Sequence, residues 1–151
     1  MSTTSTTHVR PDEGVRYPMI DGDHVVKAAV HEADGAFEVF EVHSSAGPAA
    51  PAHVSPWAGV LYLLDGALTA WVDGDTYDVE PGGLVTMPAG VPCTFSVPEG
   101  EARFLAITSG NGAARFFADF ARAVSADRPV EESMTEIMAV TARHGVSLAG
   151  T

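Results

Sequence analysis

Cysteine is nearly absent from the chain, since Cys93 is the only one in 151 residues. An intramolecular disulfide is therefore impossible, which fits a reducing cytoplasm. Zinc fingers and iron–sulfur clusters are also excluded, because both need several thiolates. No apolar run reaches about eighteen residues and no secretion signal opens the chain, so we expect a cytoplasmic protein without a membrane span.

Positive charge is scarce as well, with 8 Lys and Arg residues against 20 Asp and Glu residues and a net charge of −12. A polyanionic nucleic acid or an anionic membrane would be repelled, and no basic cluster offsets this trend. We therefore expect neither kind of partner. A hydrophobic content of 46 % is ordinary for one folded domain of this length.

What the chain does have is frequent glycine and proline, which divide its middle part into short runs of β-type residues. These runs cover residues 36–43, 59–64, 67–72, 76–79, 84–87, 93–97 and 102–108. Asp73-Gly74 between two of them is typical of a hairpin turn. Many short strands separated by turn residues indicate an antiparallel sandwich or barrel.

The pattern changes to helical spacing after Gly110. Phe116, Phe117 and Phe120 share one face of a predicted helix over 113–124, and a second helix is predicted over 130–144. Neither helix would be stable alone, so we expect both to pack on the β domain or on a partner subunit. The predicted organisation is a disordered tail over 1–14, a β-barrel over 15–110 and C-terminal helices over 111–151.

Two groups of residues recur at fixed spacing within the β-type runs. The first group is Gly47, His53, Ser55, Gly59 and Gly66, and the second is Gly82, Pro88, Gly90, Cys93 and Val97. Their spacing resembles the two motifs of the cupin superfamily. The run over 36–43 and the Arg-Phe-Phe helix extend the likeness to quercetin-dioxygenase-like monocupins of bacteria, over residues 15–148.

This resemblance implies an all-β fold, the cupin barrel (a double-stranded β-helix or jelly roll), with a C-terminal helical appendix. It also implies a homodimer, because such monocupins commonly dimerise. Metal-using cupins hold their ion with two His and a Glu from the first motif and a His from the second. Here only His53 remains, since Ser55, Gly59 and Cys93 occupy the other ligand positions. We therefore expect no metal cofactor; a rebuilt site would have to use His53 and Cys93, with His43 as a third ligand.

The same alignment of motifs directs the expected site residues into the barrel. His53 is the expected acid/base, assisted by Ser55 or by Cys93, because an imidazole exchanges protons near neutral pH. Cys93 would act as a nucleophile only if a neighbouring imidazole lowered its pKa, and is otherwise a small apolar filler. The expected walls of the ligand pocket are Trp57, Leu61, Leu63, Met87, Phe95 and His43. We assign no function to His24 or His31, and place Glu38 and Glu41 near the pocket rim.

Three functions remain open from the sequence. The first is a metal-independent enzyme that isomerises, cyclises or dehydrates an aromatic or polyketide-like metabolite by proton transfer. The second is a binding module for a small molecule without chemistry, since a fold does not imply an activity. The third is a metal-dependent dioxygenase with an unusual His/Cys site. Loss of the ligand side chains should leave a roomy apolar pocket.

Overall fold

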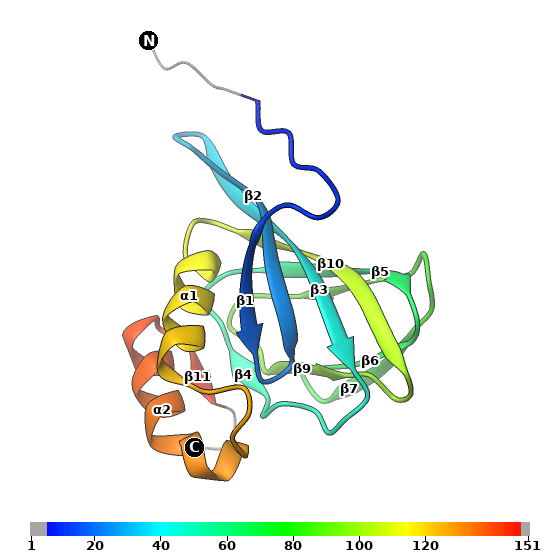
Figure 1. Ribbon diagram of the computed structural model, residues 1–151, viewed down its shortest axis with the longest axis vertical. Coiled ribbons are helices and arrows are strands. Elements are labelled where there is room, and N and C mark those ends of the chain that lie inside the picture. Colours follow the sequence, from blue (N-terminus) through cyan, green and yellow to red (C-terminus); the bar gives the residue numbers. More distant parts are fainter. Residues whose placement is uncertain (1–5, 149–151) are drawn as a thin grey trace.

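The computed structural model describes residues 6–148 and shows two antiparallel sheets that face each other, with two helices at one side (Figure 1). The larger sheet has the order β1 (Val15–Met19), β2 (Gly22–Glu32), β3 (Gly35–Ser45), β10 (Glu101–Ser109), β5 (Gly59–Asp65), β8 (Leu84–Met87). The smaller sheet has the order β11 (Ser147–Leu148), β4 (His53–Val54), β9 (Cys93–Ser96), β6 (Leu68–Val72), β7 (Asp75–Val79). This architecture confirms the predicted cupin barrel with its helical appendix.

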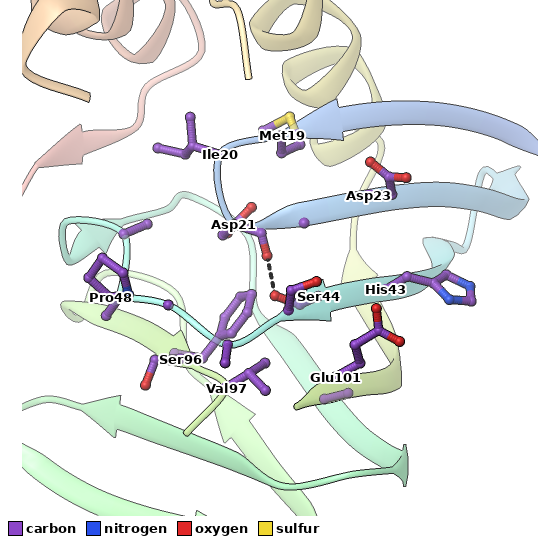
Figure 2. A pocket seen from close by; sticks show the side chains of 18 of the residues that line it. Met19, Ile20, Asp21, Asp23, His43, Ser44, Pro48, Ser96, Val97 and Glu101 are labelled. Carbon is purple, nitrogen blue, oxygen red and sulfur yellow. Dashed lines mark hydrogen bonds between the residues drawn. The ribbon is translucent and has the colours of Figure 1, made fainter. Parts of the chain in front are cut away.

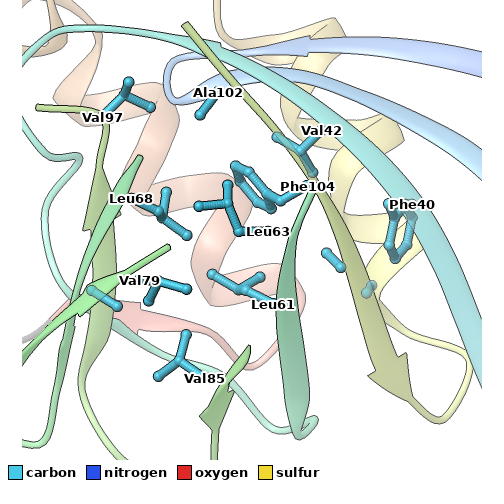
Figure 3. Close-up of a cluster of buried hydrophobic side chains, with 13 residues drawn as sticks. Phe40, Val42, Leu61, Leu63, Leu68, Val79, Val85, Val97, Ala102 and Phe104 are labelled. Carbon is cyan, nitrogen blue, oxygen red and sulfur yellow. The ribbon is translucent and has the colours of Figure 1, made fainter. Parts of the chain in front are cut away.

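Alternation of side chains along each strand builds the barrel core. In β10, Ala102, Phe104 and Ala106 are buried while Arg103 between them is exposed. Successive residues of a strand point to opposite faces, so one face of β10 joins the core and the other faces solvent. The inward residues of both sheets meet in one cluster, centred on Phe104 and Leu63 (Figure 3).

The hairpin between β6 and β7 is closed by the predicted Asp73-Gly74 turn. Both residues have positive φ values, 50° and 88°. This is the backbone of a two-residue turn whose twist matches that of the flanking strands, and Asp-Gly is among the pairs that adopt it most readily. The turn thereby fixes the register of β6 against β7.

The C-terminal segment folds back onto the barrel. It comprises α1 (Ala113–Ala123), a 3₁₀ turn η1 (Val130–Ser133) and α2 (Met134–Arg143). A second apolar cluster joins Phe116 and Phe120 of α1 to Ile137 and Val140 of α2 and to Met19 of β1. The helices therefore bury their apolar faces against their own chain. The strand that follows them, β11, pairs with β4 and was not predicted.

A carboxylate in the large sheet holds the start of α1. Glu38 of β3 is 1 % exposed, and its Oε1 accepts a hydrogen bond of 2.9 Å from the backbone N–H of Ala114. Its Oε2 lies 2.9 Å from Nε2 of His31. Glu38 therefore caps the helix from another element, which corrects the expectation that it lies at a pocket rim.

A second carboxylate ties the two helices together. Asp119 of α1 accepts hydrogen bonds from Arg143 and His144 at the end of α2, and from Arg122 one turn along α1. The hydrogen bonds from Arg143, then those from His144 and Arg122, hold the pKa of Asp119 well below its usual range. The charged form of Asp119 thus joins α1 to α2.

Part of the predicted N-terminal tail has defined contacts. Residues 10–13 form a turn, and Nζ of Lys27 in β2 donates hydrogen bonds to the carbonyls of Arg10, Pro11 and Glu13. Residues 1–5 of the predicted tail lie outside the described residues. Within 6–148, none of the helices has the length and apolar character needed to cross a membrane.

Candidate functional site

An interior cavity of about 110 Å³ lies inside the barrel, with walls supplied by both sheets and by α1. All but two of the predicted site residues line this cavity. The predicted residues that do line it are His53, Ser55, Trp57, Leu61, Met87, Cys93 and Phe95. The motif spacing therefore brings the expected acid/base and most of the expected walls to one place.

Leu63 and His43 are the two predicted pocket residues that do not line the interior cavity, and both are corrections. Leu63 is fully buried in the core cluster instead (Figure 3). His43 lies on the outer side of β3 and lines a separate, outer cavity (Figure 2). Its side chain is 43 % exposed, and its Nε2 is 2.9 Å from Oε2 of Glu41. Its neighbours Val42 and Ser44 are buried, so strand alternation turns His43 away from His53.

His53 and Cys93 are direct cross-strand partners on β4 and β9. His53 is half-buried, and no hydrogen bond joins its imidazole to another side chain in the part of the chain that the structure describes. Burial, and then the nearby carboxylate of Asp73, raise the pKa of the Cys93 thiol. The thiol donates weakly to the carbonyl of Val91 at 3.5 Å. A raised pKa favours the thiol form of Cys93, as is typical of a small apolar filler.

The residues at the motif positions do not fit the metal that other cupins hold. Ser55 and Gly59 offer no imidazole or carboxylate, and a thiol must lose its proton before it can bind a metal. Over residues 6–148, His, Cys, Asp and Glu side chains nowhere gather in threes with the geometry of a metal site. Catalytic metal sites generally use three protein ligands, so this donor set is incomplete.

Aromatic side chains narrow the interior of the barrel. Phe117 of α1 reaches the barrel interior, with its ring centroid 4.6 Å from that of His24 and 4.9 Å from that of Phe40. Phe95 packs edge-on against Phe104 at 5.2 Å. An engineered cavity of about 150 Å³ holds a single benzene ring. The interior cavity is smaller than that and so holds at most about one ring, less than the roomy pocket that the sequence suggested.

Sequence reasoning missed four polar residues of the interior cavity: Asp21, His24, Thr94 and Thr108. His24 is 5 % exposed, whereas we expected a structural or solvent-facing role. The inward direction of the His24 side chain was hard to foresee from the sequence. An irregularity between Val26 and Ala28 of β2 shifts the alternation of inward and outward side chains along the strand.

A larger outer cavity, about 730 Å³ in volume, adjoins the interior one (Figure 2). Asp21 and Phe95 line both cavities and so form the wall between them. The outer cavity also presents the carboxylates of Asp23, Asp65 and Glu101. Its acidic lining disfavours anionic molecules on the way to the interior.

The comparisons with known proteins agree with this architecture. Residues 40–108 match the family described as Cupin domain. No curated protein matches the chain. A cupin of the RmlC-like kind from Shewanella frigidimarina is similar in structure at a TM-score of 0.62 and 16 % identity, over 74 % of this chain and 96 % of that one.

Two similar structures are of named enzymes. The polyketide cyclase RemF from Streptomyces resistomycificus superposes with a TM-score of 0.56 and 23 % identity, over 70 % of this chain and 80 % of that one. The DMSP lyase DddQ from Ruegeria pomeroyi superposes with a TM-score of 0.49 and 20 % identity over 58 % of this chain, which spans 47 % of the lyase. The two-sheet barrel thus has the fold of the cupins, and residues 40–108 of the chain are similar to the Cupin domain family.

Proposed function

We propose that this cupin is a metal-independent enzyme that moves a proton on a small, ring-sized metabolite, with His53 as the acid/base. One observation carries the proposal. The imidazole of His53 lines an interior cavity with a mainly apolar wall and makes no hydrogen bond to a side chain within residues 6–148. An imidazole in that position is available to a substrate, and the apolar walls strengthen each polar contact inside.

The proposed chemistry is proton transfer at a carbon next to a carbonyl group. An imidazole nitrogen of His53 accepts the proton, the C–H bond breaks, and the electron pair moves to the carbonyl oxygen as an enolate. The O–H of Ser55 is the hydrogen-bond donor beside His53 that can stabilise this oxygen. Return of the proton from His53 to another carbon completes an isomerisation, and its transfer to a departing β-hydroxyl group, which leaves as water, completes a dehydration.

The size of the interior cavity limits the substrate to about one ring inside the barrel. A larger substrate would extend past Asp21 and Phe95 into the outer cavity. The structural likeness to a polyketide cyclase supports a cyclic or cyclising metabolite as the substrate class. The lone cysteine, kept as a thiol, is in keeping with an enzyme of the cytoplasm.

Deuterium exchange tests the proposal without knowledge of the natural substrate. The protein is treated with a chelator and incubated in D₂O with cyclohexanone and 3-cyclohexenone, and exchange of the α-protons is followed by proton NMR. We expect exchange above the buffer rate, reduced about a hundredfold or more in His53→Gln, as is usual for loss of an acid/base. His43→Gln is the matched control, because His43 lies outside the interior cavity.

The other two functions give different results in the same experiment. Saturable binding of these ketones without exchange, and with unchanged affinity in His53→Ala, would support a binding module. Exchange that appears only after addition of iron, nickel or manganese would support a metal-dependent enzyme. Either result would overturn the proposal.

A further inference from the structure

A hydroxyl group on the wall of the interior cavity is buried without a hydrogen-bond partner. Thr108 of β10 lines this cavity and is 7 % exposed, and its Oγ1 neither donates nor accepts a hydrogen bond within residues 6–148. Buried polar atoms in folded proteins nearly always have a partner, because leaving one unpaired costs free energy. The Thr108 hydroxyl is therefore available to a group that the chain itself does not supply.

The position across the sheet from this hydroxyl carries no side chain. In the strand register, Gly59 of β5 stands opposite Thr108, and Met87 of β8 stands opposite Gly59. A Cβ at Gly59 would lie 3.8 Å from Cγ2 of Thr108 and 3.9 Å from Cβ of Met87, which are ordinary contact distances. Its nearest neighbour would be the carbonyl oxygen of Ile107, at 3.5 Å. Direct neighbours on three adjacent strands thus leave room for a ligand atom beside the Thr108 hydroxyl.

The acidic neighbour of Thr108 is directed elsewhere. Glu38 of β3 stands opposite Thr108 on the other side of β10. One of its carboxylate oxygens lies 2.9 Å from the backbone N of Ala114, and the other lies 2.9 Å from Nε2 of His31. Glu38 therefore serves the start of α1 and the His31 side chain, and it leaves the Thr108 hydroxyl unpaired.

The rest of the surroundings is apolar. Two residues further along each of the three strands, the inward neighbours are Ala106, Leu61 and Val85, all buried. A buried water makes about three hydrogen bonds, and a buried ion needs several polar partners, whereas this place offers one hydroxyl. A neutral organic molecule with a single oxygen acceptor suits the place better than a water or an ion.

We propose that Thr108 binds the carbonyl oxygen of a neutral ring ketone whose ring lies over Gly59 and against Met87. The Thr108 hydroxyl donates the hydrogen bond, and the ring carbons contact the apolar wall. A ketone oxygen only accepts hydrogen bonds, so one donor satisfies it. A ligand hydroxyl would bring a donor of its own, for which Gly59 and Met87 offer no strong acceptor.

This inference rests on the proposed function in taking the interior cavity as the substrate site, and it names the substrate class. Thr108 lies at the same end of the barrel as His53. There β5 begins at Gly59, opposite Thr108, and the β4–β5 and β8–β9 connections cross between the sheets. The backbone N–H of Gly90 in one connection donates a 3.0 Å hydrogen bond to the carbonyl of Ser55 in the other. Binding by Thr108 needs no chemistry from His53, so binding can be tested alone.

Two one-ring probes test the inference: cyclohexanone, and methylenecyclohexane, in which a CH₂ group replaces the carbonyl oxygen. Binding is measured at pH 7 by NMR titration of protein carrying ¹³C-methyl methionine. Met87 lines the interior cavity and reports on it, whereas Met138 is an exposed reference on α2. We expect Thr108→Val to weaken the binding of cyclohexanone about tenfold, because the oxygen loses its donor, and not to weaken that of methylenecyclohexane.

A second variant tests where the ring lies. Gly59→Ala adds a methyl group at ordinary contact distances, and Gly59 is not among the glycines with positive φ, so this variant should fold. The methyl group occupies the place of the ring, and we expect it to weaken the binding of both probes severalfold. Thr86→Val is the matched control. Thr86 precedes Met87 on β8 but is exposed on the opposite face of the strand, so both affinities should stay unchanged.

Circular dichroism melts identify variants that fail to fold. An unchanged affinity of Thr108→Val for cyclohexanone, or equal losses for both probes, would overturn the inference. So would unchanged affinities in Gly59→Ala, or a cyclohexanone titration of the wild-type protein that leaves Met87 unmoved. Binding with the expected losses but without proton exchange would overturn only the acid/base role of His53. Proton exchange at the wild-type rate in Thr108→Val would overturn only the role of Thr108.

Discussion

Two threonines near the interior cavity show how the environment of a single hydroxyl group sets its effect on stability. Oγ1 of Thr94 donates a hydrogen bond of 2.7 Å to the carbonyl of Ala50. Oγ1 of Thr108 is buried without a partner. Valine has nearly the shape of threonine, so a change to valine removes the hydroxyl with little effect on packing.

The two threonine-to-valine substitutions should therefore have opposite effects on the free energy of unfolding. Thr94→Val should lower it by about 1 kcal/mol, because a satisfied hydrogen bond is lost and the Ala50 carbonyl loses its donor. Thr108→Val should raise it by about 1 kcal/mol, because an unpaired buried hydroxyl is removed. Urea denaturation measures both, and destabilisation by Thr108→Val would show that its hydroxyl has a partner in the ligand-free protein.

A gain in stability in Thr108→Val would indicate that the Thr108 hydroxyl is kept for a reason other than stability. Groups placed for a ligand are often unfavourable in its absence, so binding sites cost stability. Cys93 is a contrasting case at the same scale. It lies against the interior cavity, but its carbonyl partner and raised pKa describe a small filler rather than a reactive group.

At the scale of elements, the contact between β3 and α1 depends on Glu38. One carboxylate serves the helix N-terminus through Ala114 and the His31 side chain at the same time. The N-terminus of a helix carries partial positive charge and free N–H groups, so a carboxylate is a better partner there than a neutral amide.

Glu38→Gln should consequently lower the free energy of unfolding by about 1–2 kcal/mol, since a charge-assisted hydrogen bond becomes a neutral one. Glu41→Gln on the opposite face of β3 is the matched control. Glu41 pairs with His43 and Arg103 near solvent, and such pairs contribute under about 1 kcal/mol. Thermal or urea unfolding of the two variants measures both changes in the free energy of unfolding. Equal losses in the two variants would mean that Glu38 contributes no more than a surface ion pair.

The elements themselves were largely predictable, and the direction of individual side chains was not. Periodicity placed the helix at 113–124 and the Asp73-Gly74 hairpin correctly, because both are encoded by neighbouring residues. The inward direction of His24 depends on an irregularity in β2, and that of His43 on the parity of β3. Glu38 was expected at the pocket rim, because its helix partner Ala114 lies 76 residues further along the chain.

The candidate site divides in the same way. The alignment with the two motifs placed His53, Ser55 and Cys93 on one cavity, because the spacing within the motifs follows the register of the strands. The volume of the interior cavity was not foreseen, because Phe117 reaches it from a helix outside the motifs. Long-range packing of this kind leaves no local signal in the sequence.

At the scale of the whole molecule, the outer face of the large sheet carries an apolar area. Each of four neighbouring strands exposes one large apolar side chain there. In the order β3, β10, β5 and β8, these are Phe37, Ile107, Tyr62 and Leu84. Tyr62 stands opposite both Leu84 and Leu105 in the strand register, so the area is continuous. Glu41, His43 and Arg103 lie beside it. An apolar centre with a polar edge is typical of a protein interface.

We predict that a second copy of the chain covers this face. Two copies with a charge of −12 each repel one another, and a face without charges at its centre lets them meet with the least repulsion. A twofold axis through Tyr62 would place the same apolar side chains against each other, as closed dimers require. Light scattering should accordingly give about twice the chain mass of 15.7 kDa.

Tyr62→Asp should shift this mass to that of the monomer, because a charge at the centre of an apolar interface must be buried without a partner. Tyr77→Asp is the matched control. Tyr77 is 45 % exposed on β7 of the smaller sheet, away from the proposed interface, so its substitution should leave the dimer intact. A wild-type mass of one chain at tens of micromolar would contradict this prediction, as would loss of the dimer in Tyr77→Asp alone.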